Sequence, residues 1–239
     1  MKSVHWLLVM YLLAFLVFPF VKSSKEIEKY RPEELVAGRE EKGVVKIFDT
    51  LIKLTLLLVV LKFLGFRLSW LIDFAVFLTG YIFGSIFDLG IPFSLLLLGL
   101  RKSKNIFLYN VSSALTITFF SLIIGNFVPP KAAILFMALL SLYDVIGVFY
   151  IPYIKFLWLQ FSRVNFDGVA IISDDGFVGA GDFALPLIFS LSFGTFGLLS
   201  LPLFVFSFFL TSSLSKRFGA FPGLPLQTFF AYLFYFPLS

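Results

Sequence analysis

Apolar residues dominate the chain in long runs that short polar connections separate. An α-helix rises about 1.5 Å per residue, so a run of about 20 apolar residues crosses a hydrocarbon core about 30 Å thick. The pattern predicts an all-α, multi-pass membrane protein with about nine transmembrane helices in one domain. The predicted spans are residues 4–21, 46–65, 70–87, 89–100, 105–128, 131–157, 178–194, 196–214 and 221–238.

The single domain, residues 1–239, divides into an amino-terminal scaffold, residues 1–128, and spans six to nine, residues 129–239. The fourth span is short, and its length alone also fits a re-entrant or interfacial piece. If this fourth span crosses the membrane, the basic residues that lie between the later spans are all on the same side of the membrane. By the positive-inside rule this side is the cytoplasm, and the amino terminus lies on it too. These residues are Lys62, Arg67, Arg101, Lys102, Lys104, Lys155, Arg163, Lys216 and Arg217.

The segment from Lys22 to Lys46 is the exception, since it carries seven basic residues and lies on the opposite face. It also carries six glutamates and forms a long polar connection, a type that is translocated largely regardless of charge. A signal peptide over residues 1–23, cleaved after "VKS", is the alternative to a first span. The length of the apolar run favours an uncleaved span, and either interpretation leaves the amino terminus inside.

The composition excludes several classes of function. Hydrophobic residues make up 59% of the 239 residues, against about 45–50% apolar residues in a soluble domain. We attribute the net charge of +5 to helix orientation in the bilayer rather than to nucleic-acid binding, because most basic residues lie between apolar runs. The cysteine-free sequence rules out thiol catalysis and cysteine-ligated metal, and the single histidine, His5, is assigned to the interface of the first span.

Two aspartates lie inside predicted spans, where a charged carboxylate costs at least about 2.5–3.5 kcal/mol and so needs a partner, a proton or a task. Asp144 is more than ten residues from the next charge on either side, and Asp182 follows Asp175 by seven residues. The two residues are predicted at similar depths in the membrane, which allows their side chains to lie close together. The alternative is that each is protonated or bonded to a hydroxyl of a neighbouring helix. The other aspartates, expected at span ends or in the loop before the seventh span, are Asp49, Asp73, Asp88, Asp167, Asp174 and Asp175.

Two facing carboxylates rarely both ionise, so one keeps a proton and the pair titrates as a unit. Such a pair is equipped to hydrolyse a peptide bond. The ionised member takes a proton from the attacking water, and the protonated member donates to the developing oxyanion and later to the leaving amine. This chemistry requires no metal, nucleophilic serine or organic cofactor. The same pair suits a proton relay in a transporter, so the chemistry alone leaves two classes open.

The sequence around these aspartates contains three motifs. Tyr143 and Asp144 stand in "LYDVIGVFY", Gly179 to Asp182 read "GAGD", and Pro222 to Leu224 open the last span in "FPGLPLQTFFAY". In order and in span, they resemble the Tyr-Asp, Gly-x-Gly-Asp and Pro-Ala-Leu motifs of the presenilin and signal peptide peptidase family of intramembrane aspartyl proteases. The resemblance covers the carboxy-terminal half by motif and the amino-terminal half by span count.

The resemblance implies a presenilin-like bundle and an aspartic endopeptidase with Asp144 and Asp182 as catalytic residues. The expected substrates are transmembrane helices of membrane proteins or signal peptides. We expect no cofactor, no metal and no accessory subunits, and a location in a prokaryotic cell membrane. The substrate-binding residues that the motifs imply are Tyr143, Gly179, Gly181, Pro222, Gly223 and Leu224.

This chain departs from the family pattern in two ways. Gly223 replaces the alanine of the third motif, which keeps close backbone approach but leaves the segment more flexible. The connection between the two aspartates has no room for a long cytosolic insertion such as presenilin's autoproteolytic loop, so we expect a single-chain enzyme of the archaeal or bacterial kind.

The residues before Asp182 predict a β-hairpin. Two short β-prone runs, Val169–Ile172 and Phe177–Val178, flank an Asp-Gly turn signal at Asp175 and Gly176. Such a hairpin offers an edge to an unwound substrate, as in the family, while Gly179 and Gly181 allow close approach to the carboxylate. The alternatives are a plain polar loop and glycines that only pack helices.

Two other classes of protein share parts of this pattern. Prepilin peptidases also use a Gly-x-Gly-Asp aspartate, but their motif usually continues with a lysine where this chain has Ala184, which Pro186 follows as in signal peptide peptidases. A proton-coupled transporter predicts paired broken helices in two halves, and the sequence has no such symmetry.

Overall fold

The computed structural model describes residues 2–23, 53, 68–149, 169–174, 176–218 and 221–238. These residues form eight α-helices, two 3₁₀ helices and one two-stranded antiparallel sheet. The helices are α1 (Ser3–Ser23), α5 (Leu68–Ser85), α6 (Gly90–Arg101), α7 (Ile106–Phe127), α8 (Pro130–Phe149), α10 (Ala180–Ser192), α11 (Leu201–Phe218) and α12 (Leu224–Tyr235), with the 3₁₀ helices η1 (Gly194–Ser200) and η2 (Phe236–Leu238). The strands are β1 (Ala170–Ser173) and β2 (Gly176–Gly179).

The predicted helical fold class is confirmed, since eight of the nine predicted spans coincide with a described helix. The second span, residues 46–65, lies outside the described residues apart from Lys53, as does the end of the sixth, residues 150–157. By length and apolar composition, three described stretches suffice to cross a membrane: Ser3–Ser23, Ile106–Phe127 and Gly194–Arg217.

The eighth span is not one regular α-helix. It opens with η1 before continuing as α11, and the chain enters η1 at Gly194 with a φ of +65°. Glycine adopts this left-handed conformation without the steric cost that a side chain imposes. The turn from α10 into the eighth span therefore depends on this residue.

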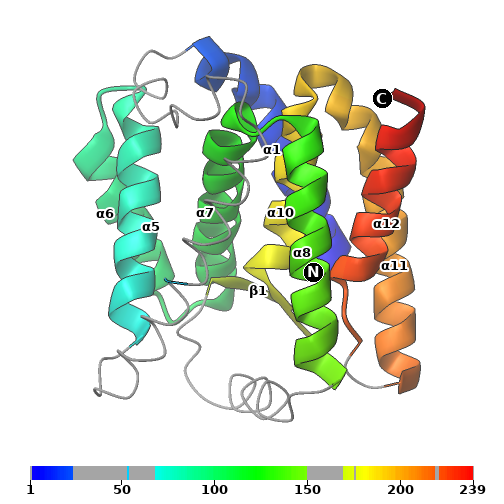
Figure 1. Cartoon of the computed structure of the whole chain (residues 1–239). Helices are drawn as coiled ribbons and strands as arrows, with labels where there is room; N and C mark the ends of the chain where they lie inside the picture. The colour runs from blue at the N-terminus through cyan, green and yellow to red at the C-terminus, as the bar shows by residue number, and fades with distance from the viewer. Residues whose placement is uncertain are drawn as a thin grey trace.

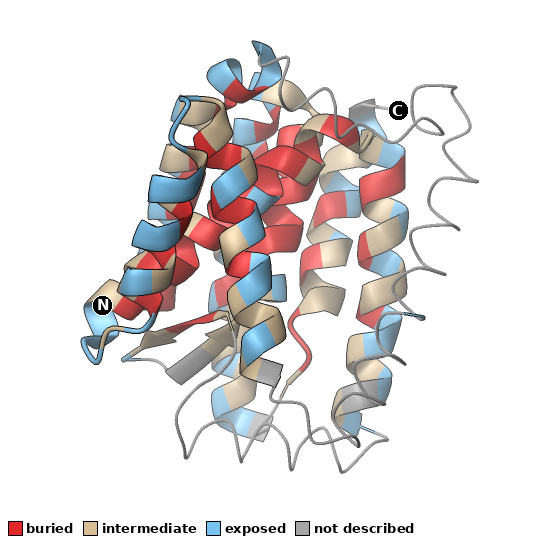
Figure 2. Cartoon of the chain, turned by 90° about the vertical axis from the view of Figure 1, so that its left-hand side faces the viewer, coloured by how far each residue is buried: buried red, intermediate tan, exposed pale blue. Residues whose placement is uncertain are grey.

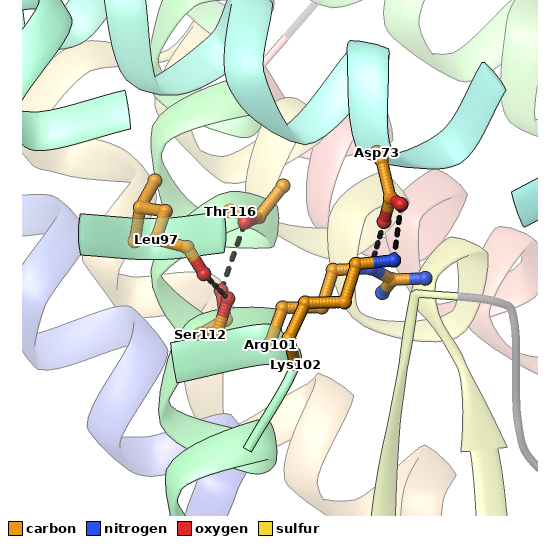
Figure 3. Close-up of polar contacts among 6 residues, drawn as sticks. All are labelled: Asp73, Leu97, Arg101, Lys102, Ser112 and Thr116. Atoms are coloured by element: carbon orange, nitrogen blue, oxygen red, sulfur yellow. Dashed lines mark hydrogen bonds and ion pairs between the residues drawn. The ribbon is translucent and has the colours of Figure 1, made fainter. Parts of the chain in front are cut away.

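The short fourth segment, α6, packs antiparallel beside α5. The Nε–H group of Arg101, at the end of α6, donates to Asp73 Oδ1 at 2.9 Å, and Lys102 pairs with the same carboxylate (Figure 3). Since Asp73 lies in the second turn of α5, the end of α6 returns to the level where α5 begins. Asp73 is therefore paired within the protein, whereas the sequence suggested a carboxylate that is merely solvated at a span end.

From α5 to α12, each described helix runs opposite to the helix before it (Figure 1). The starts of α7 and α10, the hairpin and the end of α11 lie toward the lower end in that view. Lys216 and Arg217 occupy the last turn of α11, and Arg101 ends α6. The described part of the predicted positive face thus lies at one end of the bundle, while Lys62, Arg67, Lys155 and Arg163 lie outside the described residues.

The core forms around α7 and α10, which pack along each other (Figure 2). On α7, 14 of 22 residues are buried, and many are small hydroxyl residues that allow close helix approach. Ser112 Oγ donates to the Leu97 carbonyl at 2.8 Å (Figure 3), and a Cβ at Gly125 would lie only 2.7 Å from the Leu191 side chain. The helix that carries Asp182 is therefore held at the centre of the protein.

A second close contact joins η1 to α10. The Ser190 hydroxyl bonds to the hydroxyls of Tyr11 at 2.8 Å and Ser200 at 2.6 Å, so α1, α10 and η1 share one buried polar cluster. Beside it, Gly197 lies so close to Ser190 that a Cβ would come within 1.7 Å of the Ser190 carbonyl oxygen. No side chain fits at this position without movement of the backbone.

Replacing Gly197 with alanine should therefore destabilise the protein, since overpacking costs about 1–3 kcal/mol and more where backbone must move. Gly99 is the matched control: nothing lies within 4 Å of its Cβ position, so Gly99→Ala should leave stability unchanged or raise it by about 0.5–1 kcal/mol. Thermal unfolding in detergent measures both. Equal melting temperatures for the two variants would contradict the close packing of η1 on α10.

Candidate active site

The junction of the hairpin and α10 positions Asp182. β2 ends in extended backbone at Gly179, with φ −67° and ψ 155°, and Asp182 falls in the first turn of α10. A carboxylate at this position faces the positive end of the helix dipole. The following residues, Phe183–Leu191, are all buried and hold this turn against the core, while Asp182 itself is half-buried.

Asp144 reaches the same region from α8. It is half-buried, and its Oδ2 accepts a hydrogen bond from the backbone N–H of Leu224 at 3.3 Å. About one turn away, the hydroxyls of Ser141 and Thr228 lie 2.5 Å apart, and both lie within hydrogen-bonding distance of the Met137 carbonyl, so that one of them donates to this carbonyl and the other donates to its neighbouring hydroxyl. This hydroxyl contact fixes the register of α8 against α12 and so aligns Asp144 with the first residue of α12.

Gly223 completes the arrangement. A Cβ at this position would lie 3.1 Å from Asp182 Oδ1 and 3.5 Å from Thr211 Cγ2, so the missing side chain allows Asp182 to approach the backbone. Asp144 contacts the next residue, Leu224. The two carboxylates therefore flank one two-residue segment, Gly223 and Leu224. The structure thus brings together the two aspartates that are 38 positions apart in the sequence.

The third motif lies between the carboxylates, with one difference from expectation. Phe221 and Pro222 are non-helical, but Gly223 has helical angles (φ −82°, ψ −37°) and α12 begins at Leu224. Because Pro222 has no N–H and restricts the residue before it to extended conformations, the sequence predicts that Pro222–Leu224 is non-helical, and for Leu224 this expectation is wrong. The helix starts there because Pro222 and Pro225 need no helical N–H partner at a helix start, and because the free N–H of Leu224 bonds to Asp144. In Figure 1, α12 begins above the lower end of α11.

The remaining predicted site residues surround this segment. Gly179 lies beside Asp182, since its Cβ position is 3.9 Å from Asp182 Oδ2. Gly181 is exposed, with nothing within 4 Å of its Cβ position, so among the described residues it packs against no neighbouring helix. Tyr143 is 58% exposed on α8, whereas Pro222 and Gly223 are buried.

The predicted hairpin is present as β1 and β2, but its turn lies one residue earlier than the Asp-Gly signal indicated. Ser173 pairs with Gly176, so Gly176 is the first residue of β2 rather than part of the turn. Asp175 lies outside the described residues. In this register Ile171 lies opposite Val178, and Ile172 lies opposite Phe177.

Two amide side chains near the site were not singled out from the sequence. Gln227 is 2% exposed and its Nε2 donates to the Asp182 carbonyl at 3.1 Å, which ties α12 to α10 directly beside the carboxylates. Asn110 on α7 is 4% exposed and bonds to the backbone of Ile172 in β1. The sequence signal that could have found them is an amide residue within an apolar run. An amide that is buried there without a hydrogen-bond partner costs free energy, so its presence indicates a specific partner.

Comparisons with known proteins identify the fold. No family model matches the sequence, and no curated protein matches it. A solved structure of a presenilin family intramembrane aspartate protease has a similar fold, with a TM-score of 0.67 and 20% sequence identity over 99% of this chain and 96% of that chain. The chain therefore has a presenilin-like fold along nearly its whole length.

The register of α8 against α12 can be tested by crosslinking, because the natural sequence has no cysteine. The Ser141→Cys/Thr228→Cys double variant should form a disulfide under mild oxidation, since the two hydroxyls are in hydrogen-bonding contact. Leu142→Cys/Thr228→Cys is the control, because Leu142 is 59% exposed on α8. A shift in gel mobility after oxidation measures the bond. Efficient crosslinking of the control alone would contradict the register that aligns Asp144 with Leu224.

Proposed function

We propose that this protein is an intramembrane aspartyl protease that hydrolyses peptide bonds within transmembrane segments, with Asp144 and Asp182 as its catalytic residues. The observation that carries the proposal is that the two carboxylates approach neighbouring residues of one segment, Asp182 at Gly223 and Asp144 at Leu224. The likeness in fold to a presenilin family intramembrane aspartate protease supports it.

The chemistry follows from the shared location of the two carboxyl groups. Two carboxyl groups that flank the same two-residue segment disfavour double ionisation, so in this proposal the pair holds one proton. The ionised carboxylate takes a proton from water as the water attacks the scissile carbonyl carbon. The protonated carboxyl donates to the carbonyl oxygen as the tetrahedral intermediate forms, and a proton then passes to the leaving amine as the C–N bond breaks.

Space for a substrate lies on the hairpin side of Asp182. Gly181 is exposed with open space at its Cβ position, and Gly179 adds no side chain next to the carboxylate. A membrane helix hides its peptide bonds inside its own hydrogen bonds, so a substrate must unwind before cleavage. Strand addition to the hairpin compensates for the backbone hydrogen bonds lost in that step.

The proposed substrates are transmembrane helices of membrane proteins or signal peptides. The chain carries both aspartates and all three motif segments, so we propose that it works without accessory subunits. We also propose a prokaryotic cell membrane as its location, with the basic end of the bundle and the amino terminus in the cytoplasm.

Replacing either aspartate with asparagine should abolish cleavage, because the amide keeps the size of the side chain but neither activates water nor donates a proton in the required way. Each single variant and the double variant should lose activity to the same extent, about 10⁴-fold or more, since the two act as one unit. The assay is cleavage of a purified single-span substrate in detergent or liposomes, with and without a transition-state-mimic aspartyl protease inhibitor.

Asp88→Asn is the matched control for these variants. Asp88 is exposed in the turn between α5 and α6 with a φ of +57°, a conformation that asparagine adopts readily. This variant should cleave at the wild-type rate. Normal proteolysis by Asp144→Asn or Asp182→Asn would overturn the role of that residue. A wild type without proteolysis, but with proton-dependent uptake into liposomes that the two variants lose, would identify a transporter instead.

The proposed orientation predicts the accessibility of single cysteines placed at the two ends of the bundle. Lys216→Cys lies in the last turn of α11 and Ser23→Cys ends α1, and both positions are exposed. In intact cells, a membrane-impermeant maleimide should label Ser23→Cys and should label Lys216→Cys only after permeabilisation. The reverse pattern would place the basic end of the bundle outside.

A further inference from the structure

Asn110 binds the backbone of β1 as a neighbouring strand would. Its Nδ2 donates to the Ile172 carbonyl at 2.6 Å, and the Ile172 N–H donates to its Oδ1 at 2.9 Å. One side-chain amide therefore satisfies both backbone groups of one residue. Asn110 is itself 4% exposed, so the two hydrogen bonds are formed by a side chain that is buried in the protein.

The register of the hairpin decides which backbone groups face outward. In an antiparallel pair, directly opposite residues alternate between bonded and non-bonded pairs. The backbone N–H of Ala180 donates to the Val169 carbonyl at 3.2 Å, so Val169 and Ala180 form a bonded pair. The next pair along the hairpin, Ala170 and Gly179, is therefore a non-bonded pair. The outward-facing groups are consequently those of Ala170 and Ile172 on β1 and of Phe177 and Gly179 on β2.

Helix α7 covers the outer edge of β1. Asn110 binds both backbone groups of Ile172, and α7 packs directly against β1. The outer edge of β2 is different. Within the described part of the chain, the backbone groups of Phe177 and Gly179 pair with no further strand and make no hydrogen bond outside the hairpin.

The free edge of β2 leads directly to the proposed catalytic residue. Gly179, the last residue of β2, lies three positions before Asp182, and its Cβ position is 3.9 Å from Asp182 Oδ2. An extended segment paired with β2 would therefore have its peptide groups next to this carboxylate. A shift of the hairpin along its own direction would change which peptide group lies there.

The scaffold helices support Asn110 and its neighbour. The Arg101 guanidinium lies 5.8 Å from the centre of the Tyr109 ring and is paired with Asp73. A chain of polar contacts therefore runs from α5 through α6 and α7 to the edge of β1. This chain connects the amino-terminal scaffold to the hairpin without passing through α8 or α12.

We infer that Asn110 is a positioning residue for the substrate. By closing the edge of β1 and fixing the hairpin against α7, it leaves the edge of β2 as the docking edge for an unwound peptide and sets which peptide bond reaches Asp182. This role rests on the proposed protease function. It makes Asn110 important for the affinity of helical substrates and for the position of cleavage, but not for the chemical step.

The test compares Asn110→Leu with Thr118→Val in the purified full-length protein. Leucine has nearly the shape of asparagine but forms neither hydrogen bond to Ile172. Thr118 is the matched control, because it is a fully buried polar residue on the same helix whose hydroxyl has no hydrogen-bond partner in the described structure. The substrates are a single-span membrane protein and a short soluble peptide that contains its cleavage site.

For Asn110→Leu we expect KM for the single-span substrate to rise about tenfold, in line with the loss of two hydrogen bonds. Mass spectrometry of the products should show additional cleavage sites, because the strand docks in more than one register. The kcat for the short peptide should stay within about twofold of the wild type. Thr118→Val should match the wild type in all three measurements. If Asn110→Leu fails to fold, Asn110→Asp, which keeps the acceptor for the Ile172 N–H, replaces it in the same assays.

Three outcomes would overturn the inference, and they can be distinguished. An active wild type together with an Asn110 variant of unchanged KM and unchanged cleavage sites would remove the positioning role and leave the protease function intact. The same holds if kcat falls equally for both substrates, since that result indicates general damage to the site. A wild type that cleaves neither substrate would overturn the protease function, and the positioning role with it.

Discussion

The contact of the two carboxylates with the first residues of α12 is the interaction on which the site depends. Asp144 accepts the N–H of Leu224, and Asp182 packs against Gly223. The first N–H groups of a helix have no intrahelical partner, and inside a membrane protein they need another acceptor. A helix that starts within the bundle therefore satisfies its donors with the carboxylate of α8, while the missing side chain of Gly223 lets α10 approach.

The two halves of the chain contribute in different ways to this contact. α8, α10 and α12 carry the groups that meet, and hydroxyl and amide side chains such as Ser141, Thr228 and Gln227 fix their register. α7 carries none of the carboxylates, yet it is the most buried of the long apolar helices and bonds to the hairpin through Asn110. The amino-terminal scaffold thus acts as the support against which the site is assembled.

Much of this structure could be predicted from the sequence. The runs of apolar residues predicted the helices because a run of about 20 apolar residues crosses a membrane as a helix, which satisfies its backbone hydrogen bonds within one segment. The cost of a buried carboxylate singled out Asp144 and Asp182, and the spacing of their motifs placed them on neighbouring helices in a presenilin-like order. The β-prone runs around the Asp-Gly signal predicted a hairpin, although in the structure Gly176 belongs to β2 rather than to the turn.

The sequence by itself determined the class of fold, the approximate ends of the described helices and the two aspartates worth examining, because these follow from local hydrophobicity and from the cost of charge in an apolar run. Only the tertiary structure decided that α12 starts at Leu224 beside Asp144, that Gly223 makes room for Asp182, and that Asn110 closes the edge of β1. These contacts join residues that are 41 to 80 positions apart. Such pairings depend on how helices rotate and slide against one another, and hydrophobic periodicity along one chain does not specify that geometry.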